Sequence, residues 1–258
     1  MEFIWSEEEL KNFFENIMPR LSDGEVYFLS LSARNKYLSE DEREYYKLGR
    51  NEMFERTVVR EQSFEKFLKK VHGFDRNSNA YLTKNSLPIP SNCMVCYINI
   101  NPSNVLKAYN EFTKIMNDYM MELGLNSFNN SSTSNVEQRI KKADVLLMNC
   151  IQKNRGHKSY LDVDFDIPKE HWSAVEVLLE ELEENKVEYV VIDTKSGYHV
   201  LIKKNTLNYN FNNSIELSRK YLRKKGVEDF EVVLNKNEMI PLPGTYQAGH
   251  PVRVIITS

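Results

Sequence analysis

Residues 160–166, Tyr-Leu-Asp-Val-Asp-Phe-Asp, alternate apolar and acidic side chains from the second position on. Because successive side chains of a β-strand point to opposite faces, the Asp residues would share one face and the apolar residues the other. Carboxylates this close together on a half-buried strand repel one another strongly unless a cation lies among them. The segment therefore predicts a strand whose acidic face, with Asp162 and Asp164, binds a divalent cation such as Mg²⁺ or Mn²⁺.

The size and charge of the chain limit the kinds of protein that it can be. Its 258 residues suffice for one large domain or two small lobes. A net charge of −3 argues against a protein that coats nucleic acid nonspecifically, although it permits a local basic groove. Three cysteines make no disulfide framework, and no apolar run is long enough to span a bilayer. We therefore expect a cytoplasmic protein without a membrane partner.

A polar stretch that contains two prolines, Asp75–Asn92, predicts a loop or a boundary between two parts of the chain. With the boundary placed at residue 90, residues 1–90 have the pattern of a mixed α/β portion, and residues 91–258 form the second predicted unit. Just after the boundary, Met94–Ile100 predicts a buried strand, and Asn101-Pro102-Ser103 predicts the start of a helix that Gly124 ends. A further strand is predicted at Val145–Met148.

From residue 160 on, the predicted elements follow the order β-α-β-β-α-β. After the acidic strand come a helix, two strands and a second helix, predicted at Pro168–Asn185, Val187–Asp193, Tyr198–Ile202 and Ser214–Lys225. This order is typical of a ferredoxin-like or RNA-recognition-motif-like sheet that helices cover on one face. The expected fold class is therefore α+β, with the acidic strand inside the sheet and its polar face open to a ligand.

A tight polar turn joins the last two of these predicted strands. Ser196 and Gly197 supply a hydroxyl and backbone amides that can cradle a phosphate, and His199 can donate a charge-assisted hydrogen bond to it. His199 follows the acidic strand by one helix-plus-strand unit, a distance at which both can reach one face of one sheet. Carboxylates, a turn and a histidine in this order favour phosphate chemistry.

Three motifs in this order resemble the archaeo-eukaryotic primase superfamily. They are the Asp-x-Asp at Asp162 and Asp164, the Ser-Gly-x-His at Ser196–His199 and the Leu-Pro-Gly-Thr at Leu242–Thr245. The resemblance covers residues 94–258, and Tyr97–Ser103 is also similar to a strand-to-helix junction of primase-polymerases. It implies a bilobed primase-type core with an RNA-recognition-motif-like catalytic sheet, in which two divalent ions, Mg²⁺ or Mn²⁺, act in catalysis.

The resemblance also implies roles for individual residues. Asp162 and Asp164 would be metal ligands and, with His199, the catalytic residues, while Ser196, Gly197 and His199 would hold the triphosphate of a nucleotide. The family uses a third metal-binding carboxylate, whose position here matches Asp229, with Glu231 and Glu238 as other candidates. One departure from the family pattern is Pro241, which stands where a basic residue often precedes Leu-Pro.

Basic residues just ahead of the acidic strand are candidates for binding a nucleic-acid strand. Arg155 and Lys158 are the preferred ones because they lie next to the predicted acidic face. The partners that follow from the resemblance are a single-stranded DNA or RNA template, nucleoside triphosphates, and a helicase or other replication protein on a separate chain.

The sequence thus predicts a template-dependent nucleotidyltransferase, a DNA primase or primase-polymerase that joins NTPs or dNTPs by two-metal phosphoryl transfer. A second hypothesis is a catalytically inactive primase-like module that binds single-stranded nucleic acid, which the three alternatives for the third carboxylate and the departure at Pro241 permit. A third is a nuclease or other phosphohydrolase that uses the same acids, although the histidine turn suits a triphosphate better.

Overall fold

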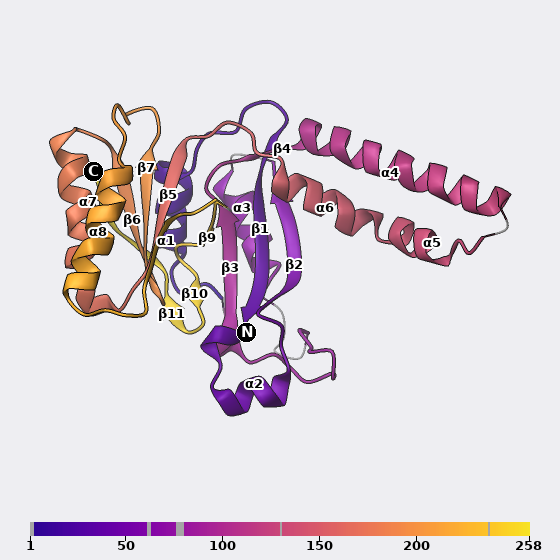
Figure 1. Cartoon of the computed structure of the whole chain (residues 1–258), viewed down its shortest axis with the longest axis horizontal. Helices are drawn as coiled ribbons and strands as arrows, with labels where there is room; N and C mark the ends of the chain where they lie inside the picture. The colour runs from indigo at the N-terminus through magenta and orange to yellow at the C-terminus, as the bar shows by residue number, and fades with distance from the viewer. Residues whose placement is uncertain (1–2, 61–62, 76–79, 130, 237) are drawn as a thin grey trace.

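The computed structural model describes residues 3–60, 63–75, 80–129, 131–236 and 238–258. As expected, the fold is mixed α+β. Two sheets, in which every strand pair is antiparallel, lie next to each other, and a helical arm projects from one of them (Figure 1).

The first sheet has the strand order β11-β10-β3-β1-β2, and β4 and β9 pair with β1 and β3 at its margins. Its strands are β1 (Glu25–Arg34), β2 (Asn51–Val59), β3 (Met94–Asn99), β4 (Ser103–Asn104), β9 (Met239–Pro241), β10 (Tyr246–Gln247) and β11 (His250–Pro251). Strands from both sides of the predicted boundary at residue 90 therefore pair in one sheet. The units predicted at 1–90 and 91–258 share the first sheet, whereas all strands of the second sheet come from residues 91–258.

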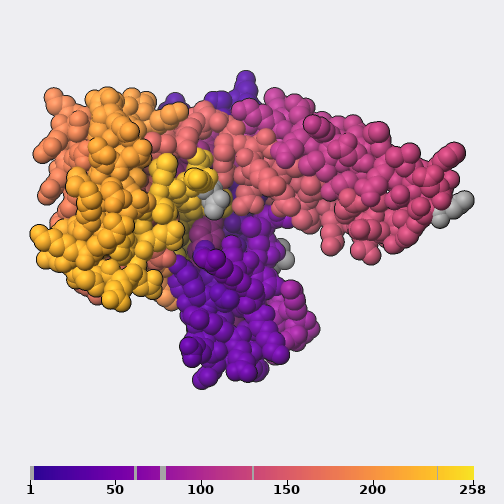
Figure 2. All heavy atoms as spheres, viewed as in Figure 1, coloured from indigo at the N-terminus to yellow at the C-terminus, as the bar shows by residue number. Residues whose placement is uncertain are grey.

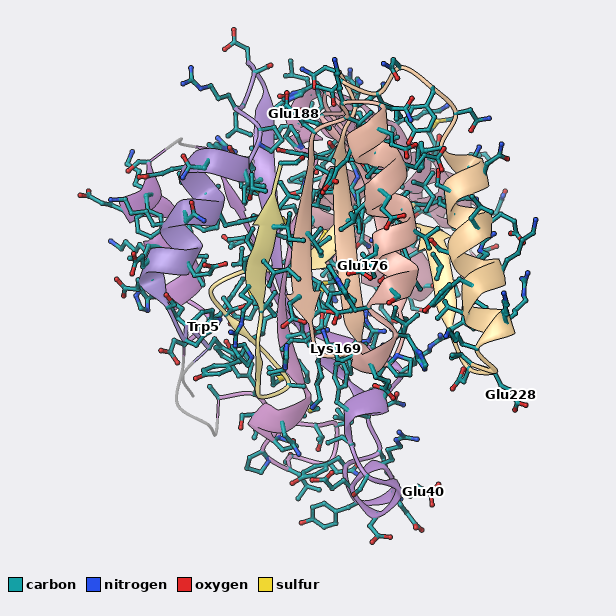
Figure 3. All side chains as sticks on the ribbon, turned by 90° about the vertical axis from the view of Figure 1, so that its left-hand side faces the viewer. Trp5, Glu40, Lys169, Glu176, Glu188 and Glu228 are labelled. Atoms are coloured by element: carbon teal, nitrogen blue, oxygen red, sulfur yellow. The ribbon has the colours of Figure 1, made fainter. Side chains whose placement is uncertain are left out.

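The second sheet has the order β12-β6-β7-β5-β8. Its strands are β5 (Tyr160–Asp166), β6 (Tyr189–Thr194), β7 (Gly197–Lys203), β8 (Glu231–Leu234) and β12 (Arg253–Thr257). Helices α7 (Ser173–Glu184) and α8 (Asn212–Lys224) cover one face of it, and Figure 3 shows α7 in front of the strands, with Glu176 labelled on it. The order of β-strands and helices predicted from residue 160 on is confirmed. The acidic strand, β5, lies inside the sheet between β7 and β8.

The alternation within β5 decides which way its side chains point. Val163 and Phe165 are fully buried in a core beneath α7 and α8, together with the apolar face of α7. The Asp residues of the strand point to the opposite face, toward the first sheet. Burial of the apolar side chains, at about 25 cal/mol per Å² of apolar surface, therefore fixes the acidic face where the two sheets meet.

A second core joins the two sheets. Helix α1 (Glu7–Asn12), the π-helical turn after it (Phe13–Ile17) and α3 (Phe64–His72) contribute apolar side chains that pack with Leu29 and Leu31 of β1. Val190, Ile192 and Leu201 of the second sheet belong to the same cluster. The remaining short elements are α2 (Glu40–Tyr46) and the 3₁₀ turns at Asn35–Tyr37, Ser91–Cys93 and Lys169–His171.

The arm consists of α4 (Val105–Phe128), α5 (Ser134–Lys141) and α6 (Ala143–Lys153). It stands clear of the body, with an open hollow beneath it (Figure 2). Its root packs on Val26 and Phe28 of β1. Within the described residues, no helix is both long and apolar enough to cross a membrane.

Two predictions for the arm are wrong. Val145–Met148 is not a strand but part of α6, where Leu146, Leu147 and Met148 pack half-buried against the root of the arm. A short apolar run fits a strand and a helix turn equally well, and here the contact with α4 decides. Gly124 does not end α4, which continues to Phe128; this glycine lies in open space, where its lack of a side chain costs only helix propensity.

Candidate active site in the cleft between the sheets

A cleft of about 540 Å³ opens between the two sheets. One wall consists of residues from the first sheet and from the turn after β1, among them Ser30, Ser32, Arg34, Lys36, Tyr37 and Tyr97. The other wall comes from the second sheet and its turns, and it includes Asp164, Asp166, Ser196, His199, Glu231 and Asn235. The acidic strand and the histidine turn, singled out from the sequence, therefore reach one cavity.

The carboxylates of β5 bracket the imidazole of His199. Asp164 and His199 are directly opposite each other in the β5–β7 register, which turns both side chains to the same face. His199 Nδ1 lies 3.0 Å from each oxygen of Asp162, and its Nε2 lies 3.7 Å from Asp164 Oδ1. Asp162 is 1% exposed, whereas the Asp164 side chain is 38% exposed. Asp162 thus contacts the imidazole from the buried side, and Asp164 faces the open cleft.

Asn235, just after β8, completes the support of Asp162. Its side-chain amide donates to Asp162 Oδ2 at 2.7 Å, and its backbone N–H donates to the Asp162 carbonyl oxygen at 2.8 Å. Asp162 is therefore fully engaged in hydrogen bonds within the protein. The sequence analysis missed Asn235, because only the pairing of β8 with β5 brings it to this place.

The charges in the cleft are strongly coupled. Burial alone would lower the pKa of His199, but Asp162 and Asp164 beside it outweigh burial and raise that pKa to about 9. Burial raises the pKa of Asp164; His199 acts against this shift, and the nearby Asp162 and Asp166 add to it. At neutral pH His199 is therefore an imidazolium that balances part of the acidic strand.

This charge state predicts a pH-dependent stability. Because the folded pKa of His199, about 9, lies above its ordinary value of 6.5, its stabilisation is complete below pH 6.5 and is lost as the pH rises through about 9. The difference in unfolding free energy between the wild type and His199→Gln should shrink by roughly 3 kcal/mol across this window. Urea unfolding in the presence of a chelator measures it. A difference that stays constant with pH would contradict the imidazolium assignment.

The turn at Ser196 and Gly197 ties the second sheet to the first. Ser196 Oγ and Tyr37 Oη lie 3.1 Å apart, and the Gln247 side-chain amide donates to the same Tyr37 oxygen at 2.7 Å. Lys36 reaches across the cleft to Asp166, with its Nζ 3.0 Å from Oδ2. Ser196 of the predicted phosphate-binding turn therefore lines the cleft, whereas Gly197 does not.

The candidates for a third carboxylate lie in three different places. Glu231 lines the cleft and is opposite Asp166 in the β5–β8 register. Asp229 is exposed, does not line the cleft, and borders a neighbouring depression. Glu238 is buried and accepts from Lys158 Nζ at 2.7 Å. Of the three, only Glu231 lines the cleft, and the depression at Asp229 is shared with Asp166, Ser196 and Glu231.

The predicted nucleic-acid contacts, Arg155 and Lys158, form ion pairs within the protein. Both face Glu238, with the Arg155 Nε 3.5 Å from its Oε2. Neither residue lines the cleft. Their role in binding a strand stays a prediction, and the two positive charges share the one carboxylate of this glutamate.

The donor set of the cleft fits a hard divalent cation that a ligand helps to coordinate. Within the described part of the chain, no group of three or more His, Cys, Asp or Glu side chains is arranged as a complete metal site. Mg²⁺, however, usually binds proteins through one or two carboxylates and completes its shell with water and substrate phosphates. Asp164 faces the cleft and is the first candidate of this kind, and Asp166, which is paired with Lys36, and Glu231 line the cleft beside it. Asp162, which the sequence predicted as a ligand, is buried and does not line the cleft.

Comparison with known proteins adds no assignment. No protein-family model, no curated protein and no solved structure matches the chain. The primase resemblance of the three motifs stays a prediction, and the chemistry of the cleft is the guide to function.

Proposed function

We propose that the chain is a template-dependent nucleotidyltransferase, a primase or primase-polymerase that joins NTPs or dNTPs by two-metal phosphoryl transfer. The observation that carries the proposal is the meeting of Asp164, Asp166, Ser196 and His199 in one cleft. Paired carboxylates suit the cations of such a reaction, and a hydroxyl with an imidazolium suits the polyphosphate of its substrate.

The arrangement of the second sheet also supports this proposal. The strands β6-β7-β5-β8 are antiparallel neighbours in this order, with α7 and α8 between β5 and β6 and between β7 and β8 in sequence. This is the succession of a ferredoxin-like β-α-β-β-α-β unit. A second sheet across a cleft agrees with the bilobed core that the primase resemblance implies.

The residues of the chain would share the work as follows. Asp164 and Asp166, with Glu231, would hold Mg²⁺ or Mn²⁺, which stabilises the charge on the attacking and leaving oxygens. Asp162 and Asn235 fix the ring of His199 through its Nδ1 side, so that the N–H of Nε2 is left to donate to a phosphate oxygen. The hydroxyl of Ser196, which also lines the cleft, would add a second donor.

The test is incorporation of a labelled nucleotide on a single-stranded template. We expect extension with NTP or dNTP in the presence of Mg²⁺ or Mn²⁺, and none with a chelator or without the template. Metal-independent binding of the oligonucleotide with no extension under any condition would refute the proposal in favour of an inactive binding module. Shortening of the oligonucleotide without added nucleotide would point instead to a nuclease.

The structure predicts which third carboxylate acts in this reaction. Glu231→Gln should lower incorporation about tenfold to a hundredfold and raise the Mg²⁺ concentration that the reaction needs, because Glu231 lines the cleft. Asp229→Asn, an equal change of charge two residues earlier, should stay within about twofold of the wild type. Metal titrations of both variants compare them, and the reverse order would restore Asp229 as the ligand.

A further inference from the structure

The wall of the cleft that faces the acidic strand carries an unusual cation. Ser30, Ser32 and Arg34 alternate along β1 and line the cleft together. Arg34 Nη1 donates to Tyr97 Oη at 2.8 Å. Its Nε is buried without a hydrogen-bond partner, and within the described residues no carboxylate forms an ion pair with its guanidinium.

The other Lys and Arg residues that line the cleft differ from Arg34. Lys36, two residues later on the same wall, is paired with Asp166 across the cleft, and Arg50 is exposed to solvent. Partial removal of a guanidinium from water without a counter-ion costs free energy. Such an arrangement is typical of a site that binds an anionic ligand. The planar fork of five N–H donors matches the oxygens of a phosphate.

The position of Arg34 places such an anion next to the acidic strand. Tyr97, which holds the guanidinium, lies close enough to Asp164 for that carboxylate to influence the pKa of its hydroxyl. Burial raises the pKa of Tyr97, so its hydroxyl stays protonated and neutral. Its Oη accepts the hydrogen bond from Arg34 without neutralising the positive charge of the guanidinium. Arg34 is thus fixed on one wall, while Ser196 and His199 lie on the other.

We propose that Arg34, positioned by Tyr97, binds a phosphate group of the ligand from the first sheet, so that this group lies between the two walls of the cleft. The inference rests on the proposed function for the class of ligand, a nucleotide or a nucleic-acid strand, but it does not require turnover. The phosphate belongs either to the polyphosphate of a nucleotide or to the backbone of a strand, and the two sources are separable by experiment.

Calorimetric titration with inorganic tripolyphosphate, and separately with a short oligothymidylate, tests the inference in the presence of Mg²⁺. Arg34→Gln should weaken the binding of one of these probes by about 10-fold to 100-fold, the effect of losing hydrogen bonds to a charged group. Arg34→Lys keeps the charge but loses the fork, and should recover only part of the affinity. Arg20→Gln, an equal change of charge at an exposed position away from the cleft, should bind both probes as the wild type does.

The probe that weakens identifies the source of the phosphate. Loss for tripolyphosphate assigns Arg34 to the nucleotide, and loss for the oligothymidylate assigns it to the strand. Unchanged affinity of Arg34→Gln and Arg34→Lys for both probes would overturn the inference. Thermal unfolding of each variant shows whether it is folded, and Arg34→Lys keeps the test decisive if Arg34→Gln does not fold.

Tyr97→Phe examines the positioning role separately. It removes only the oxygen that holds the guanidinium, so affinity for the same probe should fall less than in Arg34→Gln, by about threefold to tenfold. Combined with Arg34→Gln it should add nothing further, because the two residues act as one unit. Full additivity would contradict that coupling. Since these titrations measure binding alone, they can succeed even if no nucleotide is ever incorporated.

Discussion

Asp164→Asn should abolish most nucleotide incorporation, by about a hundredfold to a thousandfold, while leaving the fold at least as stable as in the wild type. Activity should be lost because Asp164, of the two carboxylates that flank His199, is the one that faces the cleft. Stability should be unchanged or higher because burial raises the pKa of Asp164, which means that burial disfavours the ionised carboxylate. The neutral amide of Asn avoids this free-energy cost.

Activity and thermal unfolding measured on the same samples check this prediction. Glu180→Gln is the matched control, since it removes one carboxylate from an exposed position on α7 and should change neither quantity. Asp162→Asn gives the contrast. It should lower activity as well, but also destabilise the fold, because Asp162 is buried between His199 and Asn235. An active Asp164→Asn enzyme would remove the acidic strand from the mechanism.

Gly197→Ala should destabilise the protein by about 3 kcal/mol or more and disrupt the turn before His199. A Cβ at residue 197 would lie 1.8 Å from the carbonyl oxygen of Phe165, on the strand that carries the acids. The backbone at Phe165 cannot move away without breaking the hydrogen bonds between β5 and β7, in which Gly197 is opposite Asp166. The packing of these two strands leaves no room for any side chain.

Urea unfolding of Gly197→Ala against Gly226→Ala isolates this effect. Gly226 also has a positive φ, of 74°, but nothing lies within 4 Å of the position of its Cβ. Its substitution should therefore cost only the backbone term of about 1 kcal/mol. Equal losses in the two variants would mean that the clash at Phe165 is relieved and does not govern the turn.

The strands and helices of the second sheet could be predicted because each has a clear pattern within its own short segment of sequence. The period-2 alternation of β5 and the apolar stripe of α7 each specify a face without reference to distant residues. The meeting of Asp164 with His199 could also be expected, since both belong to one compact run of elements. The Val145–Met148 segment failed because four apolar residues carry no period of their own.

The rest of the cleft was beyond prediction from the sequence for a different reason. Arg34 and Tyr97 lie on strands far from the acidic segment in sequence, and only the packing of one sheet against the other brings them near it. Asp229 illustrates the limit of spacing, because it precedes β8 and does not line the cleft, whereas Glu231, two residues later at the start of the strand, does. A motif distance cannot resolve such a shift, whereas strand register does.

Residues 3 and 4 are joined to the segment around residues 245 and 246, and this has a consequence for folding during synthesis. Ile4 bridges Thr245, and the backbone amide of Tyr246 donates to the Phe3 carbonyl oxygen at 2.8 Å. During synthesis, residues 3 and 4 are made long before residues 245 and 246, so this early segment has to wait for its partners. The cleft, which Gln247 lines, is likewise complete only after residue 247 has been made, and until then the apolar side chains buried by these contacts are exposed on the nascent chain.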